Sequence, residues 1–181
     1  MNERVYNRGV DPLRSPERVS RLEVNRVVDN CLMDTNISSV LDVGTGSGLF
    51  AEEFSKRGLK VAAIDPNPEM ITATQNILPL IDIRKASAED IPFEDNSFDL
   101  VFMGLVFHEV DDYLKAINEA YRISRKEVSI LEWEYQDQDF GPPLEHRLQS
   151  TFIQELTEKA GFKKVEIIKL TSLILYKCIK N

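Results

Sequence analysis

Three glycines alternate with small residues directly after a short apolar run. They are Gly44, Gly46 and Gly48, and the run before them covers residues 40–43. Glycine adopts positive φ readily and has no Cβ, so a ligand can approach the backbone of such a turn closely. Leu49 stands where the dinucleotide pattern GxGxxG needs a glycine, and no Lys-Ser or Lys-Thr pair closes a phosphate-binding loop. The spacing therefore favours a ligand other than a dinucleotide or a nucleoside triphosphate.

Two carboxylates flank this glycine turn. Asp42 lies in the apolar run before it, and Asp65 ends the next apolar run. A carboxylate at the position of Asp65 can accept hydrogen bonds from two ribose hydroxyls. Asp42 can satisfy a ligand ammonium group directly or through water, whereas it would repel a pyrophosphate. The pair predicts a ligand that carries a ribose and an amino-acid tail.

The elements that must position these residues alternate between strand and helix. Short apolar runs predict strands, and apolar residues at helical spacing predict the helices between them. The expected strands cover residues 40–43, 60–64, 81–85, 98–104, 127–132, 165–170 and 172–179. The expected helices cover residues 16–33, 49–57, 68–78, 113–124 and 149–160. This order is typical of an α/β fold with a mostly parallel sheet, helices on both faces and an antiparallel pair at the edge. Residues 136–147 are polar, contain Gly141-Pro142-Pro143, and predict a long loop that is a candidate lid.

Several ordered segments resemble the seven-stranded, Rossmann-like S-adenosylmethionine-dependent methyltransferases, in particular the quinone-biosynthesis type. Residues 40–48 resemble motif I of that family, and Ala63-Ile64-Asp65-Pro66 resembles its ribose-binding motif. Residues 86–93 resemble the segment that brackets adenine, 98–101 the fourth strand, and Gly161-Phe162 the turn before the final hairpin. The resemblance implies a three-layer sandwich with a seven-stranded sheet. The length of the chain fits one domain over residues 1–181, and the resemblance implies an N-terminal helical cover (1–37) on a Rossmann-like core (38–181).

The resemblance also implies a cofactor site for S-adenosylmethionine. Gly44, Thr45 and Gly46 would line the methionine moiety, Asp65 the ribose, and Ser87 to Glu89 the adenine. The full set of expected cofactor residues is Asp42, Gly44, Thr45, Gly46, Gly48, Asp65, Pro66, Met70, Ser87, Ala88, Glu89, Gly104 and Leu105. Two positions depart from the family pattern: Ser87 replaces the usual Asp, and Arg125-Lys126 replaces the usual Pro-Gly-Gly turn.

Methyl transfer from a sulfonium mainly needs in-line placement of the acceptor, so few catalytic residues are expected. His108, after the fourth predicted strand, is the candidate general base because its ordinary pKa lies near neutrality. A packed structural histidine is the other interpretation. The expected substrate-binding residues are Tyr6, Glu109, Trp133, His146 and Arg147. Trp133 also suits packing beneath the following loop, and Arg147 also suits a loop-fixing interaction.

Composition limits the partners. The formal net charge of −8 opposes binding to nucleic acid or anionic lipid, and no apolar run approaches the length of a membrane span. Residues 1–10 lack the apolar stretch of a secretory signal, so a cytoplasmic location is expected. Cys31 and Cys178 belong to no metal-binding cluster, so we expect reduced core cysteines and no metal site.

The function expected from the sequence is methyl transfer from S-adenosylmethionine to a small-molecule acceptor by in-line displacement. A protein or nucleic-acid methyltransferase, a non-catalytic S-adenosylmethionine-binding protein and an NAD-dependent oxidoreductase are the alternatives. The acceptor and the oligomeric state stay open.

Overall fold

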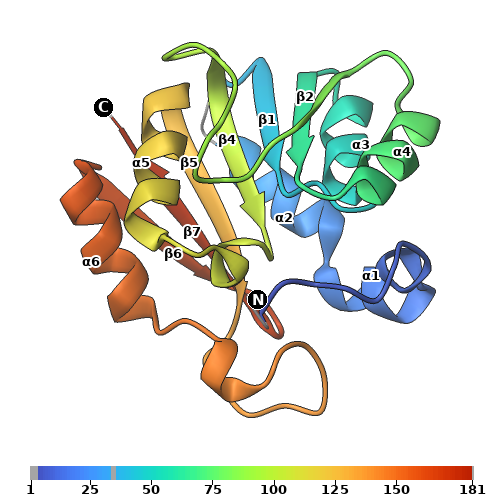
Figure 1. Cartoon of the computed structure of the whole chain (residues 1–181). Helices are drawn as coiled ribbons and strands as arrows, with labels where there is room; N and C mark the ends of the chain where they lie inside the picture. Colours follow the sequence, from blue (N-terminus) through green and yellow to red (C-terminus); the bar gives the residue numbers. More distant parts are fainter. Residues whose placement is uncertain (1–3, 34–35, 181) are drawn as a thin grey trace.

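A mixed β-sheet forms the centre of the computed structural model, which describes residues 4–33 and 36–180 (Figure 1). Within these residues the sheet has seven strands in the order β3-β2-β1-β4-β5-β7-β6. The strands are β1 (Ser39–Val43), β2 (Lys60–Asp65), β3 (Asp82–Lys85), β4 (Phe98–Gly104), β5 (Ser124–Trp133), β6 (Lys164–Lys169) and β7 (Leu173–Ile179). The strands β1 to β5 pair in parallel, and β7 runs antiparallel between β5 and β6. The expected fold class is confirmed.

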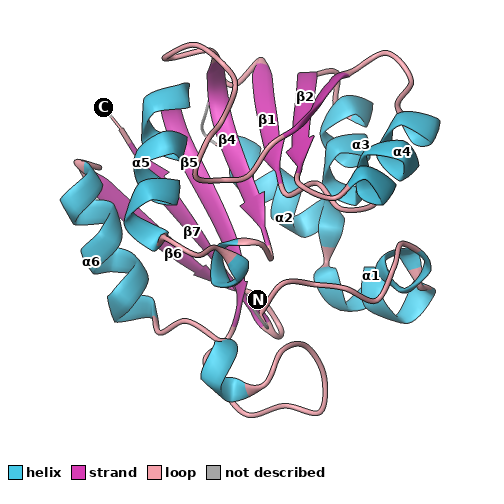
Figure 2. Ribbon diagram, viewed as in Figure 1, coloured by secondary structure: helices cyan, strands magenta, loops and turns pink. Residues whose placement is uncertain are grey.

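Helices cover both faces of the sheet (Figure 2). On one face, α2 (Val24–Leu32) and α3 (Leu49–Lys56) pack in the same apolar cluster as Val40, whereas α5 (Tyr113–Ile123) and α6 (Ser150–Ala160) share the opposite cluster with Leu41. Consecutive residues of a strand point to opposite faces, so β1, which is buried along its whole length, supplies both cores. The helix α4 (Pro68–Ile77) lies against β2 and β3. Its start is as expected, because the Asn67 side chain accepts a hydrogen bond from the Glu69 amide.

The parallel strands end at one edge of the sheet, and their ends position the site. The residues after β1 form the glycine turn, while Asp65 and Gly104 are the last residues of β2 and β4. Ligands of open α/β sheets bind outside the carboxyl ends of the strands. The N-terminal segment, drawn in dark blue in Figure 1, passes near this edge.

The N-terminal helix is broken, so the expectation of a single helix over residues 16–33 is wrong. The chain forms a short 3-10 turn η1 (Asp11–Arg14), then α1 (Pro16–Leu22) and α2, with Glu23 between the helices at φ 48°. The Glu23 carboxylate accepts hydrogen bonds from Arg26 and from the backbone amide of Thr171. This distant contact holds the left-handed residue in place. Residues 1–3 and 34–35 of the predicted cover lie outside the described residues.

Two strands differ from their sequence expectation. β3 is mostly exposed rather than buried on both faces, because it forms one edge of the sheet. β5 begins directly after α5, so Arg125 and Lys126 lie inside the strand and not in a turn before it. Both side chains pair with the buried Asp99 carboxylate, at 3.2 and 3.5 Å. These ion pairs link the start of β5 to β4, the strand that contains Asp99.

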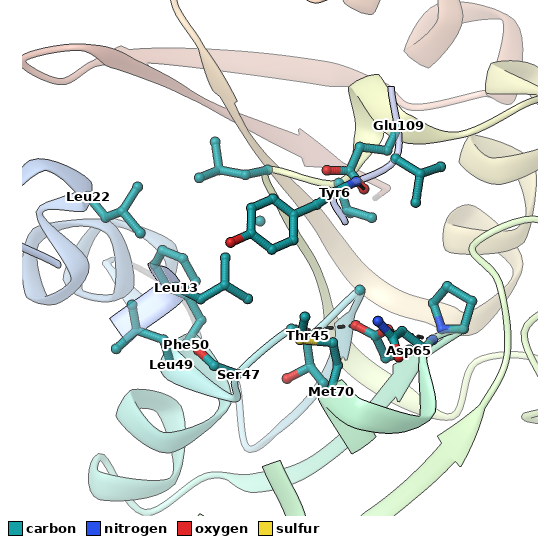
Figure 3. A pocket seen from close by; sticks show the side chains of 18 of the residues that line it. Tyr6, Leu13, Leu22, Thr45, Ser47, Leu49, Phe50, Asp65, Met70 and Glu109 are labelled. Carbon is teal, nitrogen blue, oxygen red and sulfur yellow. Dashed lines mark hydrogen bonds between the residues drawn. The ribbon is translucent and has the colours of Figure 1, made fainter. Parts of the chain in front are cut away.

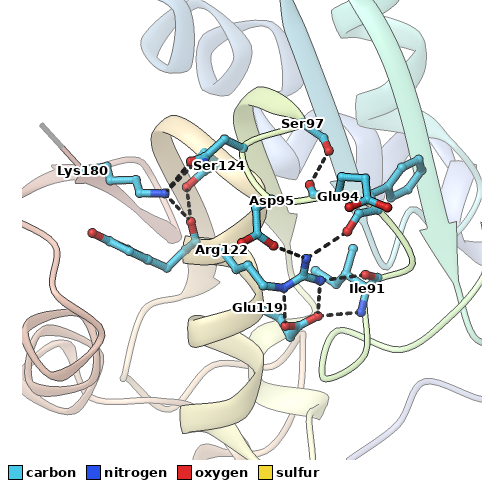
Figure 4. Close-up of polar contacts among 11 residues, drawn as sticks. Ile91, Glu94, Asp95, Ser97, Glu119, Arg122, Ser124 and Lys180 are labelled. Atoms are coloured by element: carbon cyan, nitrogen blue, oxygen red, sulfur yellow. Dashed lines mark hydrogen bonds and ion pairs between the residues drawn. The ribbon is translucent and has the colours of Figure 1, made fainter.

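The long connection between β3 and β4 is held by Arg122 of α5 (Figure 4). Its guanidinium donates to the carbonyl oxygens of Ile91 and Phe93 and pairs with Asp95. Glu119 pairs with Arg122 and accepts a hydrogen bond from the Ile91 amide at 2.9 Å. The network fixes the part of the connection that follows Ser87 to Glu89. Within the described chain, no helix has the length and apolar character needed to cross a bilayer.

Candidate functional site

The glycine turn between β1 and α3 brings the backbone close to neighbouring elements. Gly44, Gly46 and Gly48 all have positive φ, at 66°, 54° and 74°. A Cβ on Gly44 would lie 2.4 Å from Cγ2 of Val106, and one on Gly48 would lie 2.9 Å from Oγ1 of Thr74. Packing therefore requires glycine at both positions, and the turn is a cradle of backbone whose residues Gly44, Thr45 and Gly46 line a cavity.

Asp65 closes the cradle from the end of β2. Its Oδ2 accepts a hydrogen bond from the Gly46 amide at 2.9 Å, and Oδ1 accepts one from the Asn67 amide at 2.8 Å. Burial raises the pKa of Asp65, and these two hydrogen bonds offset part of that effect. A carboxylate here suits a ribose diol, because each oxygen can accept more than one hydrogen bond.

Asp42 lies behind the turn and not on the cavity. It is 2% exposed, and its Oδ2 accepts a hydrogen bond from the Thr45 hydroxyl at 2.7 Å. Burial raises the pKa of Asp42 to about 7, although the Thr45 hydrogen bond lowers it. Asp42 thus contacts Thr45, which lines the cavity, and does not line the cavity itself.

A cavity of about 800 Å³, counting its opening to solvent, lies over the glycine turn (Figure 3). That size is ordinary for a small-molecule site. Ten of the residues expected from the sequence line it: Gly44, Thr45, Gly46, Asp65, Pro66, Met70, Gly104, Leu105, Tyr6 and Glu109. The other expected residues do not line it: Asp42, Gly48, Ser87, Ala88, Glu89, His108, Trp133, His146 and Arg147. The structure thus brings the glycine turn, the end of β2 and the start of the chain around one space.

The cavity has an apolar wall that the sequence did not indicate. Leu13 and Leu22 come from the cover, and Phe50 comes from α3. Arg18 of α1 also lines the cavity and was not among the expected residues. Leu22 and Phe50 also belong to an apolar core cluster, so one sequence carries no signal that separates a core residue from a cavity-lining one.

The expected adenine segment lies beside this cavity. The Ala86 amide donates a hydrogen bond to the Asp65 carbonyl oxygen at 3.3 Å, which ties the segment to the end of β2. Ala88 is buried in the core, and Glu89 accepts a hydrogen bond from the Asp111 amide. The adenine-binding role of Ser87, Ala88 and Glu89 stays a prediction.

His108 lies behind the cavity in a short 3-10 turn, η2 (Phe107–Glu109). It is 4% exposed, its Nδ1 lies 2.8 Å from Glu132 Oε2, and its backbone amide donates to Glu132 Oε1. Burial lowers the pKa of His108, but the charge and hydrogen bond of Glu132 outweigh it, so the net shift is upward. The imidazolium is therefore favoured.

Glu109 is the carboxylate that reaches the cavity beside this histidine. Its Oε1 lies 3.8 Å from Nε2 of His108, and its Oε2 accepts a hydrogen bond from the Tyr6 amide at 3.2 Å. Burial raises the pKa of Glu109, and the charge of His108 and the Tyr6 hydrogen bond lower it in part. Figure 3 shows the Tyr6 ring extending from the side of Glu109 toward Leu13 and Leu22.

Three expected substrate residues lie in or beneath the loop after β5. Arg147 is 4% exposed and makes five hydrogen bonds, four of them to backbone carbonyl oxygens of the loop. The Trp133 ring packs against Phe140, with ring centroids 5.8 Å apart. His146 ends the 3-10 turn η3 (Leu144–His146). Their substrate-binding roles stay predictions.

Residues 41–131, half of the chain, match the family described as "Methyltransferase domain". The chain therefore belongs to this methyltransferase family, which confirms the resemblance seen in the sequence. An uncharacterized methyltransferase of Mycobacterium tuberculosis is 38% identical over 103 residues, which cover 56% of this chain and 42% of that protein. A demethylmenaquinone methyltransferase of Renibacterium salmoninarum is 33% identical over 103 residues, which cover 57% and 44%. The chain spans less than half the length of these two relatives.

The crystal structure of a SAM-dependent methyltransferase from Aquifex aeolicus superposes with a TM-score of 0.83. It is 27% identical, and the match covers 95% of this chain and 97% of that one. The expected cofactor of the family, S-adenosylmethionine, is thereby confirmed. The cradle at Gly44, the carboxylate of Asp65 and the cavity above them fit this cofactor.

Proposed function

We propose that this protein transfers a methyl group from S-adenosylmethionine to a small-molecule acceptor. The observation that carries the proposal is a cavity lined both by the glycine turn and Asp65 and by the apolar side chains of Leu13, Leu22 and Phe50. A mostly apolar pocket with few polar groups suits a small organic molecule. The net charge of −8 opposes a nucleic-acid acceptor.

S-adenosylmethionine supplies an activated methyl group for in-line displacement. In this proposal, the chain's own residues orient the two molecules and hold a proton acceptor near them. Glu109 is the carboxylate that faces the acceptor, and His108 acts through it as a positioning residue. The charge of His108 favours ionised Glu109, the form that accepts a proton. Turnover should then rise as pH rises through the elevated pKa of Glu109.

Cofactor binding tests the proposal first. Asp65→Ala should weaken S-adenosylmethionine binding at least about 30-fold, because about 2 kcal/mol of hydrogen bonding to the cofactor and to the Gly46 amide is lost. Isothermal titration calorimetry on the full chain measures this. Asp82→Ala removes an exposed carboxylate that pairs with Arg84, so it serves as the matched control. Equal affinity in wild type and Asp65→Ala would contradict the assignment of Asp65.

Acceptor transfer is tested with metabolite pools. The purified chain is incubated with S-adenosylmethionine and fractionated small molecules, and S-adenosylhomocysteine release is followed together with a mass gain of one methyl group. We expect release with at least one small-molecule fraction. Release only with protein or RNA fractions would overturn the small-molecule proposal.

A further inference from the structure

Two buried atoms on the N-terminal cover have no hydrogen-bond partner. They are Tyr6 Oη and Arg18 Nε, and no other buried side-chain nitrogen or oxygen of the described chain lacks a partner. Both residues line the cavity over the glycine turn. Buried polar groups are almost always hydrogen-bonded in native proteins, so two orphans in one cavity indicate a missing ligand group.

The guanidinium of Arg18 is also uncompensated. Its side chain makes no hydrogen bond or ion pair with any described residue, whereas Arg14 of the preceding turn pairs with Glu52 and donates to the Ser47 carbonyl oxygen. Burial lowers the pKa of Arg18, and the charge of Glu109 raises it only in part. Burying a cation without a partner is unfavourable. Arg18 therefore needs an anion more than a neutral acceptor.

The contacts between the cover and the glycine turn indicate where this anion would lie. A Cβ on Gly46 would come 3.3 Å from Cδ1 of Leu13, so the cover lies directly against the glycine turn. Arg14 ties the same segment to the Ser47 carbonyl oxygen at 2.9 and 3.0 Å. The orphan atoms thus belong to the same space as the glycine turn and Asp65.

We propose that Arg18 and Tyr6 form a subsite for the carboxylate or phosphate group of a molecule bound in this cavity. The inference rests on the proposed function, because it concerns the cavity assigned there. A guanidinium and a phenol both donate, and an anionic oxygen accepts from both at once. Two molecules can supply such a group: the cofactor, through its amino-acid carboxylate, or the acceptor.

Calorimetry with two cofactors tests the first source. S-adenosylmethionine and decarboxylated S-adenosylmethionine differ only in the carboxylate. If the cofactor supplies the anion, the full wild-type chain should bind the carboxylated form at least ten-fold more tightly, and Arg18→Met should reduce that ratio to within two-fold. Arg21→Met removes the same charge from the same helix outside the cavity lining, so it should keep the wild-type ratio.

Anion titration tests the second source. The chain is loaded with S-adenosylhomocysteine, and benzoate or inorganic phosphate is titrated in. If the acceptor supplies the anion, saturable binding should occur in wild type and Arg21→Met and be lost in Arg18→Met. Tyr6→Phe, which keeps the ring, should weaken whichever binding is found several-fold.

The outcomes separate this inference from the function itself. If Arg18→Met matches wild type in both titrations, with an unchanged circular dichroism spectrum, the subsite is overturned while the cofactor site stands. If wild type binds neither cofactor, the proposed function fails instead.

Discussion

The loop after β5 contains a buried arginine, Arg147, and the N-terminal cover contains a half-buried one, Arg18. The two arginines differ in their hydrogen-bond partners. Arg147 in the loop makes five hydrogen bonds to residues between Glu134 and Pro142. The Arg18 side chain in the cover makes none with any described residue, and its Nε is enclosed. A guanidinium whose donors all have hydrogen-bond partners stabilises the backbone around it. A buried guanidinium donor without a partner costs free energy, and a bound ligand that accepts its hydrogen bond removes that cost. Arg147 thus stabilises the folded loop, whereas the proposed role of Arg18 in the cover is to bind a ligand.

The largest effect on stability is expected at Arg147. Arg147→Met should lower the free energy of unfolding by about 3 kcal/mol, because several loop carbonyl oxygens lose a charged donor in a buried position. Denaturant titration followed by tryptophan fluorescence measures this, and Trp133 beneath the loop is the one tryptophan of the chain. Affinity of the folded variant for S-adenosylmethionine should stay within two-fold of wild type.

Arg84→Met is the matched control for this change. Arg84 is an exposed arginine that pairs with Asp82 on the edge strand β3. An exposed ion pair contributes little, so this variant should lose well under about 1 kcal/mol. If Arg147→Met loses no more stability than Arg84→Met, the loop is not organised by its arginine, and the contrast between the two regions fails.

The second effect concerns Glu132, which lies on β5 just before the loop and pairs with His108 behind the cavity. Glu132→Gln removes the charge that raises the pKa of His108 and leaves the burial that lowers it. Glu109 still raises that pKa and Arg4 lowers it. The pKa of His108 should therefore fall below its wild-type value, as followed by NMR of the ring protons, with His146 as the second histidine for assignment.

Glu132→Gln should also change how the free energy of unfolding depends on pH. Because the folded-state pKa of His108 is raised, the pair contributes fully below the unfolded pKa of about 6.5, and that contribution is lost as pH rises through the folded value. Wild type should exceed Glu132→Gln by about 2 kcal/mol at pH 5.5, with the gap narrowing above neutrality. A gap that is constant across pH would mean that His108 carries no charge in the native protein.

Much of the fold was predictable because it depends on local sequence. The alternation of apolar runs and helical patterns indicated all seven strands, and β4 has the expected bounds. Gly44, Gly46 and Gly48 adopt the positive φ that a binding turn requires. The break at Glu23 was not predictable, since it depends on a hydrogen bond from Thr171, 148 residues away. A local pattern cannot report a contact at that separation.

The site was predictable on one side only. The turn and Asp65 follow from spacing after apolar strands, and they line the cavity as expected. His108 and Arg147 were chosen for their side-chain chemistry, and both lie away from the cavity lining. Arg147 has hydrogen-bond partners and the Arg18 side chain has none because of where carbonyl oxygens of irregular backbone lie. A sequence pattern does not predict the positions of those oxygens. The contribution of the cover to the cavity could therefore be seen only in the structure.

The smallest predicted effect is on the stability of the cover itself. Arg18→Met should leave the free energy of unfolding unchanged or raise it by up to about 1 kcal/mol without ligand, because methionine keeps an apolar stem and removes an uncompensated cation. Thermal or denaturant unfolding of the ligand-free protein measures this, beside Arg14→Met, whose loss of the Glu52 pair and the Ser47 hydrogen bonds should destabilise. A ligand-free Arg18→Met that is clearly less stable than wild type would mean that Arg18 already has its partner within the chain. The opposite signs expected at Arg14 and Arg18, which are four residues apart, separate an arginine that holds the cover in place from one that awaits an anion.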